Sequence, residues 1–306
     1  MKEDNEWNLE YEGSDENNTG GDSSKKSSDN QGEYDESQES TAKTVTNVNE
    51  IGVTIRNTKA PIVVLFGEPS CGKTMTLVRL TRWLKKNRYT VEPDPNFRNS
   101  DDGEYEEMCN NFPTLINSDV AADRTESIAF MLLTVRDEYA RTICQVLEAP
   151  GEAFIEDDYP TYIRQITELK KVPKTWLFFV DAGKDSKRHA AYMENICALQ
   201  KGVISRNDRV LFVCNKADLR IDLHSGGYPV KQQFFNCIED KYTSAINAFK
   251  NDIPIIKWFR PYNFDFVVFS AGAFTPMRDK KKFKYIASDD DYPASLWKSI
   301  MKTVRG

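Results

Sequence analysis

Residues 67–74 have the types and spacing of a loop that binds phosphate. They read Gly-Glu-Pro-Ser-Cys-Gly-Lys-Thr and match the pattern G-x-x-x-x-G-K-[ST]. Glycines at both ends let the main chain curl, so that its N–H groups can surround phosphate oxygens. Lys73 would reach the β- and γ-phosphates of a nucleotide, and the Thr74 hydroxyl would be a ligand of Mg²⁺. The residues expected to hold the phosphates are Gly67, Ser70, Cys71, Gly72, Lys73 and Thr74.

The residues on either side of this loop predict the elements that position it. The apolar run 61–66 is typical of a buried strand, and apolar residues from Leu77 to Leu84 recur with helical spacing. The helix is expected to end near Asn87, ahead of two prolines. Its N-terminus would add a positive dipole end to the phosphate site. A strand before the loop and a helix after it are the context that the motif requires.

The rest of the chain alternates between strand-like and helix-like segments. A short polar connection joins two β-rich runs, 128–135 and 141–147, and predicts an antiparallel hairpin. The run 176–180 is continuously apolar, as a parallel strand covered on both faces should be. Further strands are expected at 209–214 and 264–270, and helices at 162–171, 188–200, 231–249 and 294–303. We therefore predict an α/β fold with a doubly wound, mostly parallel sheet and one antiparallel strand.

Ligands bind such sheets at the carboxyl ends of the strands, where two short polar boxes fall. The run 209–214 leads into Asn215, Lys216, Ala217 and Asp218, and the run 264–269 leads into Ser270, Ala271 and Gly272. With the loop 67–74 ahead of both boxes, the sequence resembles the translation-factor-related (TRAFAC) class of P-loop GTPases, which contains Ras-like and Era-like proteins. The resemblance implies a small GTPase-like fold. The acidic beginning of the chain and the turn at 150–152 suggest a bacterial member of the class.

In that class the two boxes form the pocket for guanine. The Asp218 carboxylate can accept hydrogen bonds from the N1 and N2 donors of guanine, a pattern that adenine does not offer. By the resemblance, the Lys216 stem would lie over the purine, and Asn215 would tie its box to the phosphate loop. The N–H of Ala271 would bind guanine O6. The ligands expected are thus GTP and GDP, held by Asn215, Lys216, Asp218, Ser270, Ala271 and Gly272.

By the same resemblance, residues 148–151 stand where the class carries an Asp-x-x-Gly box. The Gly151 N–H would contact the γ-phosphate, and the Glu148 carboxylate would hold Mg²⁺ through water. Glu replaces Asp in this sequence, and the extra methylene moves the carboxylate by about 1.5 Å. The metal ligands implied are Thr74, Thr125 and Glu148.

Residues near the γ-phosphate would govern hydrolysis. Thr125 is assigned as the switch I threonine in preference to Thr114, and Arg124 beside it is expected to be a solvated loop residue, with a cis arginine finger as the alternative. Glu152 stands where the class often has a glutamine that positions the attacking water. Its negative charge beside phosphate predicts slow intrinsic hydrolysis unless a partner supplies positive charge. The catalytic residues implied are Lys73, Thr125, Gly151 and Glu152.

Composition divides the chain into a tail and one domain. Residues 1–48 are rich in Ser, Asn, Asp, Glu and Gly with few large apolar side chains, which predicts a disordered acidic tail. Residues 49–306 are expected to form the GTPase domain. Within it, residues 92–124 form a long polar insertion before the switch I threonine, which we expect to be a lid or a mobile segment.

Several kinds of protein are disfavoured by composition. The 306-residue chain has no apolar run of membrane-spanning length and starts without the features of a secretory signal, so a cytoplasmic protein is expected. Its six scattered cysteines and two histidines disfavour a disulfide framework or a zinc site, and Cys71 is expected to be a small core filler in preference to a thiol of lowered pKa. Residues 1–43 hold thirteen Asp/Glu and four Lys/Arg, a balance of -9, so the remainder carries +3 of the net -6 and gives no strong nucleic-acid signal. The lysines at 280–284 are expected to be solvated, with an anionic partner or membrane as the alternative.

The leading hypothesis is a Mg²⁺-dependent protein that binds and hydrolyses GTP and acts as a molecular switch, with a protein effector or activator. A second hypothesis is a GTP-bound interaction module with little hydrolysis, because Glu148 and Glu152 both depart from the pattern of the class. A third is an ATP-dependent P-loop kinase or ATPase, in which Asp181 at the end of the run 176–180 would hold Mg²⁺.

Overall fold

The structure of the chain is a computed structural model. It describes residues 52–68, 70–99, 101–120, 130–149, 166, 168–169, 171–181, 189–217, 242–251, 258, 262–277 and 283–305. The chain divides into two compact units, Met1–Thr41 and Ala42–Gly306, and every described residue belongs to the second. The expected acidic tail, 1–48, lies outside the described residues.

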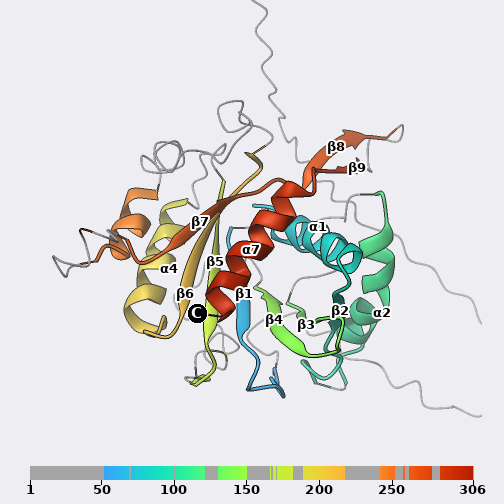
Figure 1. The fold of residues 1–306 in the computed structure, drawn as a ribbon, viewed down its shortest axis with the longest axis horizontal. Helices are drawn as coiled ribbons and strands as arrows, with labels where there is room; N and C mark the ends of the chain where they lie inside the picture. Colours follow the sequence, from blue (N-terminus) through green and yellow to red (C-terminus); the bar gives the residue numbers. More distant parts are fainter. Residues whose placement is uncertain are drawn as a thin grey trace, which may run out of the picture. The chain divides into compact units, whose positions relative to one another are not determined.

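A seven-stranded sheet organises the second unit (Figure 1). Its order is β2-β3-β4-β1-β5-β6-β7, so β1 lies at the centre. β3 runs antiparallel to both of its neighbours, while β1, β4, β5, β6 and β7 pair in parallel. The strands are β1 Ile62–Phe66, β2 Thr90–Pro93, β3 Leu132–Arg136, β4 Thr142–Glu148, β5 Lys174–Asp181, β6 Arg209–Asn215 and β7 Asp265–Val268. The prediction of a mostly parallel sheet with one antiparallel strand is confirmed, as is the hairpin of β3 and β4.

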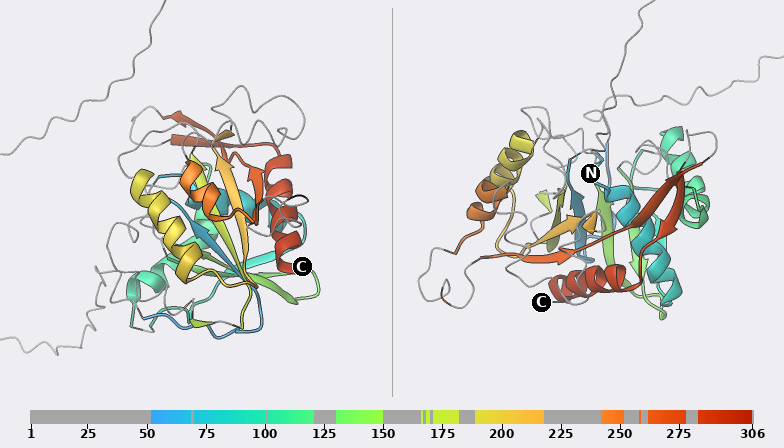
Figure 2. Two further views of the ribbon diagram at one scale, coloured as in Figure 1. Left: turned by 90° about the vertical axis from the view of Figure 1, so that its left-hand side faces the viewer. Right: turned by 90° about the horizontal axis from the view of Figure 1, so that it is seen from above.

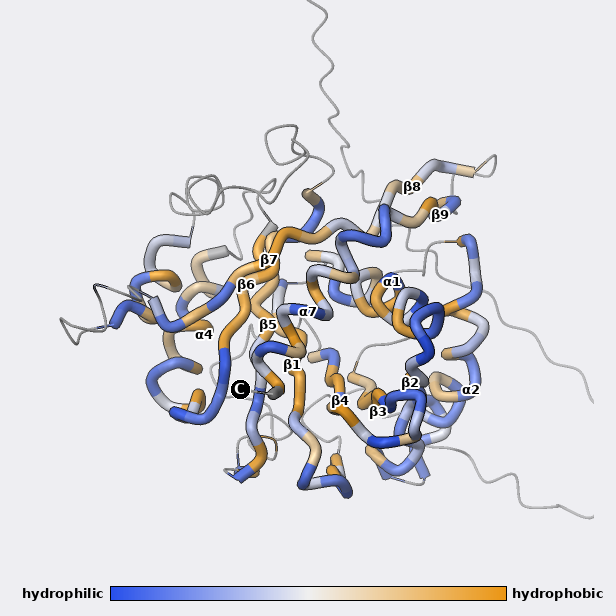
Figure 3. The backbone as a smooth tube through the Cα atoms, in the orientation of Figure 1, coloured by the Kyte–Doolittle hydropathy of each residue, from blue (hydrophilic) through white to orange (hydrophobic). Residues whose placement is uncertain are grey.

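The central strands are apolar along their whole length because both faces of the sheet are covered. All five residues of β1 are buried, and the colouring by hydropathy is strongest along β1, β4, β5 and β6 (Figure 3). Aromatic rings fill the space beside the sheet: Phe178 packs edge-on against Phe66 and tilts against Phe212, with ring centroids 5.4 and 5.6 Å apart. This packing fixes where the ends of β1, β5 and β6 lie relative to one another.

Helices cover both faces of the sheet. α4 (His189–Gly202) lies on one face, and α1 (Lys73–Lys86) and α7 (Asp291–Arg305) lie together on the other (Figure 2). α1 ends at Lys86 with Asn87 as its C-cap, in agreement with the end predicted near Asn87. Residues 242–248 are helical, within the helix expected at 231–249; the remainder of that helix and most of 162–171 lie outside the described residues. The doubly wound α/β arrangement is thus confirmed for the described elements.

Residues 92–124, expected to be a polar insertion that forms a lid or a mobile segment, contain regular structure that was not predicted. β2 continues to Pro93, and α2 (Gly103–Asn117) packs beside α1. Asp102 caps this helix by accepting a hydrogen bond from the Tyr105 N–H at 3.0 Å. Tyr105 and Phe112 are buried on the inner face of the helix. Burial of this apolar stripe holds the helix in place despite its polar outer face.

A small two-stranded sheet follows the second polar box and was not predicted. β8 (Gly272–Pro276) pairs antiparallel with β9 (Phe283–Ala287), and Figure 1 shows them beside α1. The outer edge of β9 also pairs with the chain after α2, because the Tyr285 N–H donates to Asp119 O at 2.7 Å. No helix within the described ranges has the length and apolar character needed to cross a membrane.

Candidate functional site

The loop after β1 requires glycine at both ends. A Cβ on Gly67 would lie 2.7 Å from Cys71 Sγ and 2.8 Å from Phe179 Cβ, which is closer than carbon atoms pack. Gly72 has a φ of 92°, in the left-handed region, and is the residue from which α1 starts. Cys71 is buried with its thiol against Gly67, so the filler role expected for it is consistent with the packing.

Lys73 places a buried cation in the bend of this loop. The residue is 3% exposed, and Nζ donates to Gly67 O at 2.8 Å and to Glu68 O at 3.1 Å. Both partners are neutral main-chain carbonyls, so the charge is stabilised without being neutralised by them. A cation held in this way, beside the N-terminus of a 14-residue helix, is suited to bind an anion.

The base of the loop is supported by a tyrosine from α4. The Tyr192 hydroxyl lies 3.1 Å from Phe66 O and 2.9 Å from Phe179 O, the carbonyls of two adjacent strands just below the loop. Burial raises the pKa of Tyr192 well above its ordinary value, so the hydroxyl keeps its proton as a donor. Tyr192 thereby fixes the ends of β1 and β5 relative to each other.

Thr74, in the first turn of α1, meets Glu148, at the end of β4. β4 pairs with β1 so that Glu148 lies opposite Leu65, and the Thr74 hydroxyl donates to Glu148 Oε1 at 2.6 Å. Glu148 is 1% exposed. The glutamate side chain therefore reaches the hydroxyl in spite of its extra methylene. Two oxygen ligands at one point suit Mg²⁺, which prefers carboxylate and hydroxyl oxygens.

The first polar box is joined directly to the phosphate loop. Asn215 ends β6, and its Nδ2 donates to Cys71 O at 2.8 Å. Both residues are buried. Lys216 follows with a φ of 58°, which turns the chain sharply away from the strand. The tie from Asn215 to the phosphate loop, implied by the family resemblance, is present in the structure.

The second box lies beside the first. The Ala217 N–H donates to Phe269 O at 3.1 Å, and the Phe269 N–H donates to Cys214 O at 2.8 Å. Ser270 and Ala271 follow directly and are both buried. The main chain at 214–217 therefore holds the Ser270–Ala271 peptide close to Asn215, which bonds the phosphate loop. Three segments far apart in the sequence, 67–74, 215–217 and 270–272, form one site.

Four of the sequence-predicted residues lie outside the described residues, namely Thr125, Gly151, Glu152 and Asp218. Asp181, the metal ligand of the ATPase hypothesis, is the last residue of β5 and pairs in register with Asn215.

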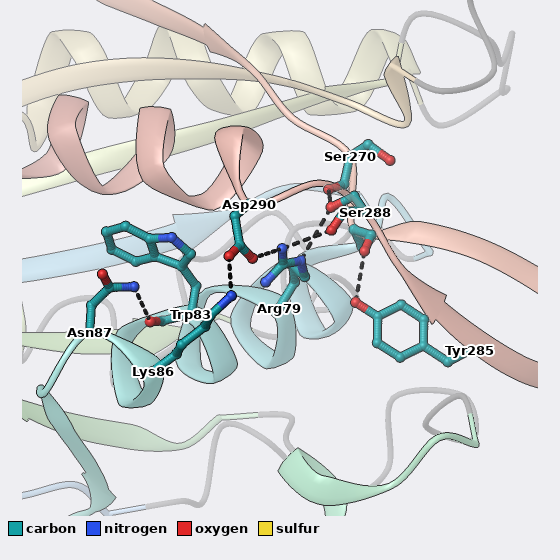
Figure 4. Close-up of polar contacts among 9 residues, drawn as sticks. Arg79, Trp83, Lys86, Asn87, Ser270, Tyr285, Ser288 and Asp290 are labelled. Carbon is teal, nitrogen blue, oxygen red and sulfur yellow. Dashed lines mark hydrogen bonds and ion pairs between the residues drawn. The ribbon is translucent and has the colours of Figure 1, made fainter.

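The sequence did not predict the residues of α1, and of β9 and the turn after it, that position the second box through hydrogen bonds. Ser288 and Tyr285 bond its carbonyls, and Arg79 of α1 bonds Ser288 (Figure 4). No local motif marks these three residues, because each acts through a contact with a segment distant in the sequence. The one available signal in the sequence was an arginine, Arg79, between the apolar residues Val78 and Leu80 of the expected helix.

The residues of the site fit a nucleotide with Mg²⁺. The phosphate loop supplies a buried ammonium and the first turn of a helix, and the Thr74 hydroxyl with the Glu148 carboxylate supplies oxygens of the kind that the metal prefers. When bound, Mg²⁺ would neutralise charge on the phosphate oxygens. The two boxes stand where a base attached to these phosphates could reach them, on the side of Asn215.

No family model and no curated protein matches the chain. Among solved structures it is similar to nucleolar GTP-binding protein 1 from Plasmodium falciparum, with 14% sequence identity, a TM-score of 0.33, and coverage of 71% of this chain and 80% of that one. It is also similar to a variant of the protein SsGBP, with 12% identity, a TM-score of 0.33 and coverage of 70% of this chain. The chain spans 50% of the length of that second protein. Function is therefore inferred from the contacts of the site itself.

Proposed function

We propose that this chain binds GTP and GDP with Mg²⁺, hydrolyses GTP and acts as a molecular switch. The observation that carries the proposal is the 2.8 Å hydrogen bond from Asn215 Nδ2 to Cys71 O. This bond joins a box whose chemistry suits guanine to a loop whose chemistry suits phosphates. A strand end that takes no part in nucleotide binding would not need a buried amide bonded to the phosphate loop.

On the base side, Asp218 accepts hydrogen bonds from guanine N1 and N2, the Lys216 stem covers the purine, and the Ala271 N–H donates to O6. The buried Ser270–Ala271 peptide beside the Asn215 box supports this assignment. Adenine carries a donor in place of O6 and lacks the N1 and N2 donors, so its nucleotides would meet mismatched groups at both contacts.

On the phosphate side, Lys73 neutralises the terminal phosphates, and Thr74 and Glu148 hold Mg²⁺ together with Thr125. The Gly151 N–H contacts the γ-phosphate. The short bond between the Thr74 hydroxyl and the Glu148 carboxylate supports the metal assignment, because both oxygens already face one point.

Hydrolysis is slow in this proposal and is accelerated by a protein activator. Glu152 stands close to the attacking water, where its negative charge opposes the approach to phosphate. Residues 49–306 act as the GTPase domain in the cytoplasm, and the acidic residues 1–48 form a tail. Part of the region 92–158, which contains the switch threonine, changes position with the state of the nucleotide.

The base specificity is tested by displacement of a fluorescent GDP from the full chain. Excess ADP should fail to displace it, whereas GDP should displace it fully. Asp218→Asn should weaken GDP about tenfold to a hundredfold and strengthen xanthosine diphosphate, because the amide offers a donor where the carboxylate accepted. Asp265→Asn, which changes a β7 side chain bound to Lys302, is the matched control and should leave both affinities unchanged.

Two results would refute parts of the proposal. Displacement of GDP by ADP, or unchanged GDP affinity in Asp218→Asn, would exclude the guanine pocket. Single-turnover hydrolysis of bound GTP decides the enzymatic part. A rate equal to that of free GTP in buffer would leave a nucleotide-binding module without hydrolysis.

A further inference from the structure

The Ser270–Ala271 peptide is held by side chains that follow it in the chain. The Ser288 hydroxyl donates to Ser270 O at 2.7 Å, and the Tyr285 hydroxyl donates to Ala271 O at 2.7 Å. The Ser288 N–H also donates to Ala271 O, at 3.0 Å. Figure 4 shows these contacts converging on the box from β9 and the turn after it.

The small sheet packs against the box without space between them. Gly272 has a φ of 132°, and a Cβ on it would lie 2.0 Å from Ile286 O. Only glycine allows the two strands to approach this closely at the point where β8 leaves the box. The position of the Ser270–Ala271 peptide is therefore coupled to that of β9.

α1 holds this assembly in turn. Arg79 is 4% exposed; its Nη2 donates to Ser288 O at 2.8 Å and to Asp290 Oδ1 at 2.7 Å, and its Nε donates to Ser288 Oγ at 3.3 Å. The Arg82 guanidinium lies over the Tyr285 ring, 4.9 Å from its centroid. Burial raises the pKa of Tyr285, so its hydroxyl remains a donor. The helix that begins with Lys73 thus also anchors the second box.

The geometry of the peptide bond gives these contacts a role in base recognition. Ser270 O and the Ala271 N–H belong to the same planar trans peptide, so they point in opposite directions. Fixing Ser270 O by the Ser288 hydroxyl therefore fixes the direction of the Ala271 N–H. A donor on the carbonyl also polarises the peptide and strengthens the N–H as a donor. Within the described part of the chain, the Ala271 N–H has no acceptor.

We infer that Ser288, Arg79 and Tyr285 are positioning residues for recognition of the base. They orient the Ala271 N–H relative to the phosphate loop and so set the preference for a base with an oxygen at C6, without touching the nucleotide. This inference rests on the proposed function, since it concerns the same site. A hydrogen-bonded series runs from Arg79 of α1 through the Ser288 hydroxyl to the peptide that would meet the base.

The test compares three ligands on the full chain with wild type, Ser288→Ala, Ser288→Thr and the control Ser299→Ala on α7. The ligands are GDP, the diphosphate of 2-aminopurine riboside, which lacks O6, and inorganic pyrophosphate, which contacts the phosphate loop alone. Ser288→Ala should weaken GDP about tenfold, equivalent to about 1.4 kcal/mol. It should change the affinities for the O6-deficient analogue and for pyrophosphate by less than about twofold. Ser288→Thr keeps the hydroxyl and should restore the affinity for GDP.

Tyr285→Phe provides a second variant, because it removes one hydroxyl and keeps the ring under Arg82. It should show the same selective loss for GDP. Equal loss for GDP and pyrophosphate would mean that the residues support the fold or the phosphate loop, and would overturn the inference. Unchanged GDP affinity in Ser288→Ala, with normal binding by wild type, would overturn it as well. Failure of wild type to bind GDP would overturn the proposed function itself.

Discussion

Gly72 and Asn215 provide a test of the site that needs no nucleotide. A Cβ on Gly72 would lie 2.4 Å from Asn215 Nδ2, so Gly72→Ala must displace the Asn215 amide. That amide donates to Cys71 O at 2.8 Å and is buried. The substitution therefore has two effects, strain at a φ of 92° and loss of a buried hydrogen bond.

The size of each effect follows from the geometry. A residue with a Cβ in the left-handed region costs about 1–2 kcal/mol. Leaving the buried Cys71 carbonyl without its donor costs about 1–3 kcal/mol. Gly72→Ala should therefore lower the free energy of unfolding by about 2–5 kcal/mol, and Asn215→Ala by about 1–3 kcal/mol. In the double variant the amide is already absent, so Gly72→Ala should add only the backbone strain.

A double-mutant cycle measures this difference by urea unfolding of the four proteins. The coupling free energy between Gly72→Ala and Asn215→Ala should be about 1–3 kcal/mol. Gly202→Ala is the control, because a Cβ there meets nothing within 4 Å, and it should not lower stability. Single effects that add within about 0.5 kcal/mol would show that the amide does not lie against the loop, and the reasoning would fail.

Two more predictions concern charge. Mg²⁺ should strengthen GDP binding about tenfold less, or lower still, in Glu148→Gln than in wild type, because the amide next to the Thr74 hydroxyl lacks the negative charge of the carboxylate. The measurement is the ratio of GDP affinities with and without Mg²⁺. A ratio equal to that of wild type would contradict this prediction. Hydrogen bonds from Lys86 and Arg79 lower the pKa of Asp290 below its ordinary value of 3.8. The ionised carboxylate therefore contributes fully to stability above pH 3.8, and this contribution is lost as the pH falls through the lower pKa of the folded state. The difference in unfolding free energy between wild type and Asp290→Asn should be constant near neutral pH and shrink below pH 3.8, whereas a difference independent of pH would refute the assignment.

The parts of the fold that could be predicted are those fixed by short stretches of sequence. The run 61–66 must be a buried strand because it is apolar on both faces, and the spacing of Gly67 and Gly72 permits few backbone paths. Both features depend on neighbours along the chain, so the sequence alone is sufficient to predict them. The tie from Asn215 to the phosphate loop joins distant residues and was expected only from the resemblance of its box to the GTPase class.

The parts that could not be predicted depend on distant contacts. α2 was hidden by its charged residues and by Pro113, although Tyr105 and Phe112 have the spacing of one helix face. The strands β8 and β9 lack a clear alternation of apolar and polar residues. Their apolar side chains do not mark a buried face either, because Phe274 and Ile286 are both substantially exposed. Their pairing is secured by Tyr285 bonding to Ala271 O and Asp119 O, contacts that no local pattern encodes.

The central position of β1 also has a consequence for synthesis of the chain. Its partners are β4 and β5, which end at Glu148 and Asp181, and the amide that secures the phosphate loop belongs to Asn215. At about 5–20 residues per second, a ribosome delivers Asn215 roughly 7–30 s after Lys73. For roughly the first 4–15 s of that interval, until β4 has been made, the five apolar residues of β1 have no strand to pair with, which exposes the nascent chain to aggregation. The phosphate loop, the earliest part of the site to be made, thus takes its final shape only after Asn215 has been made.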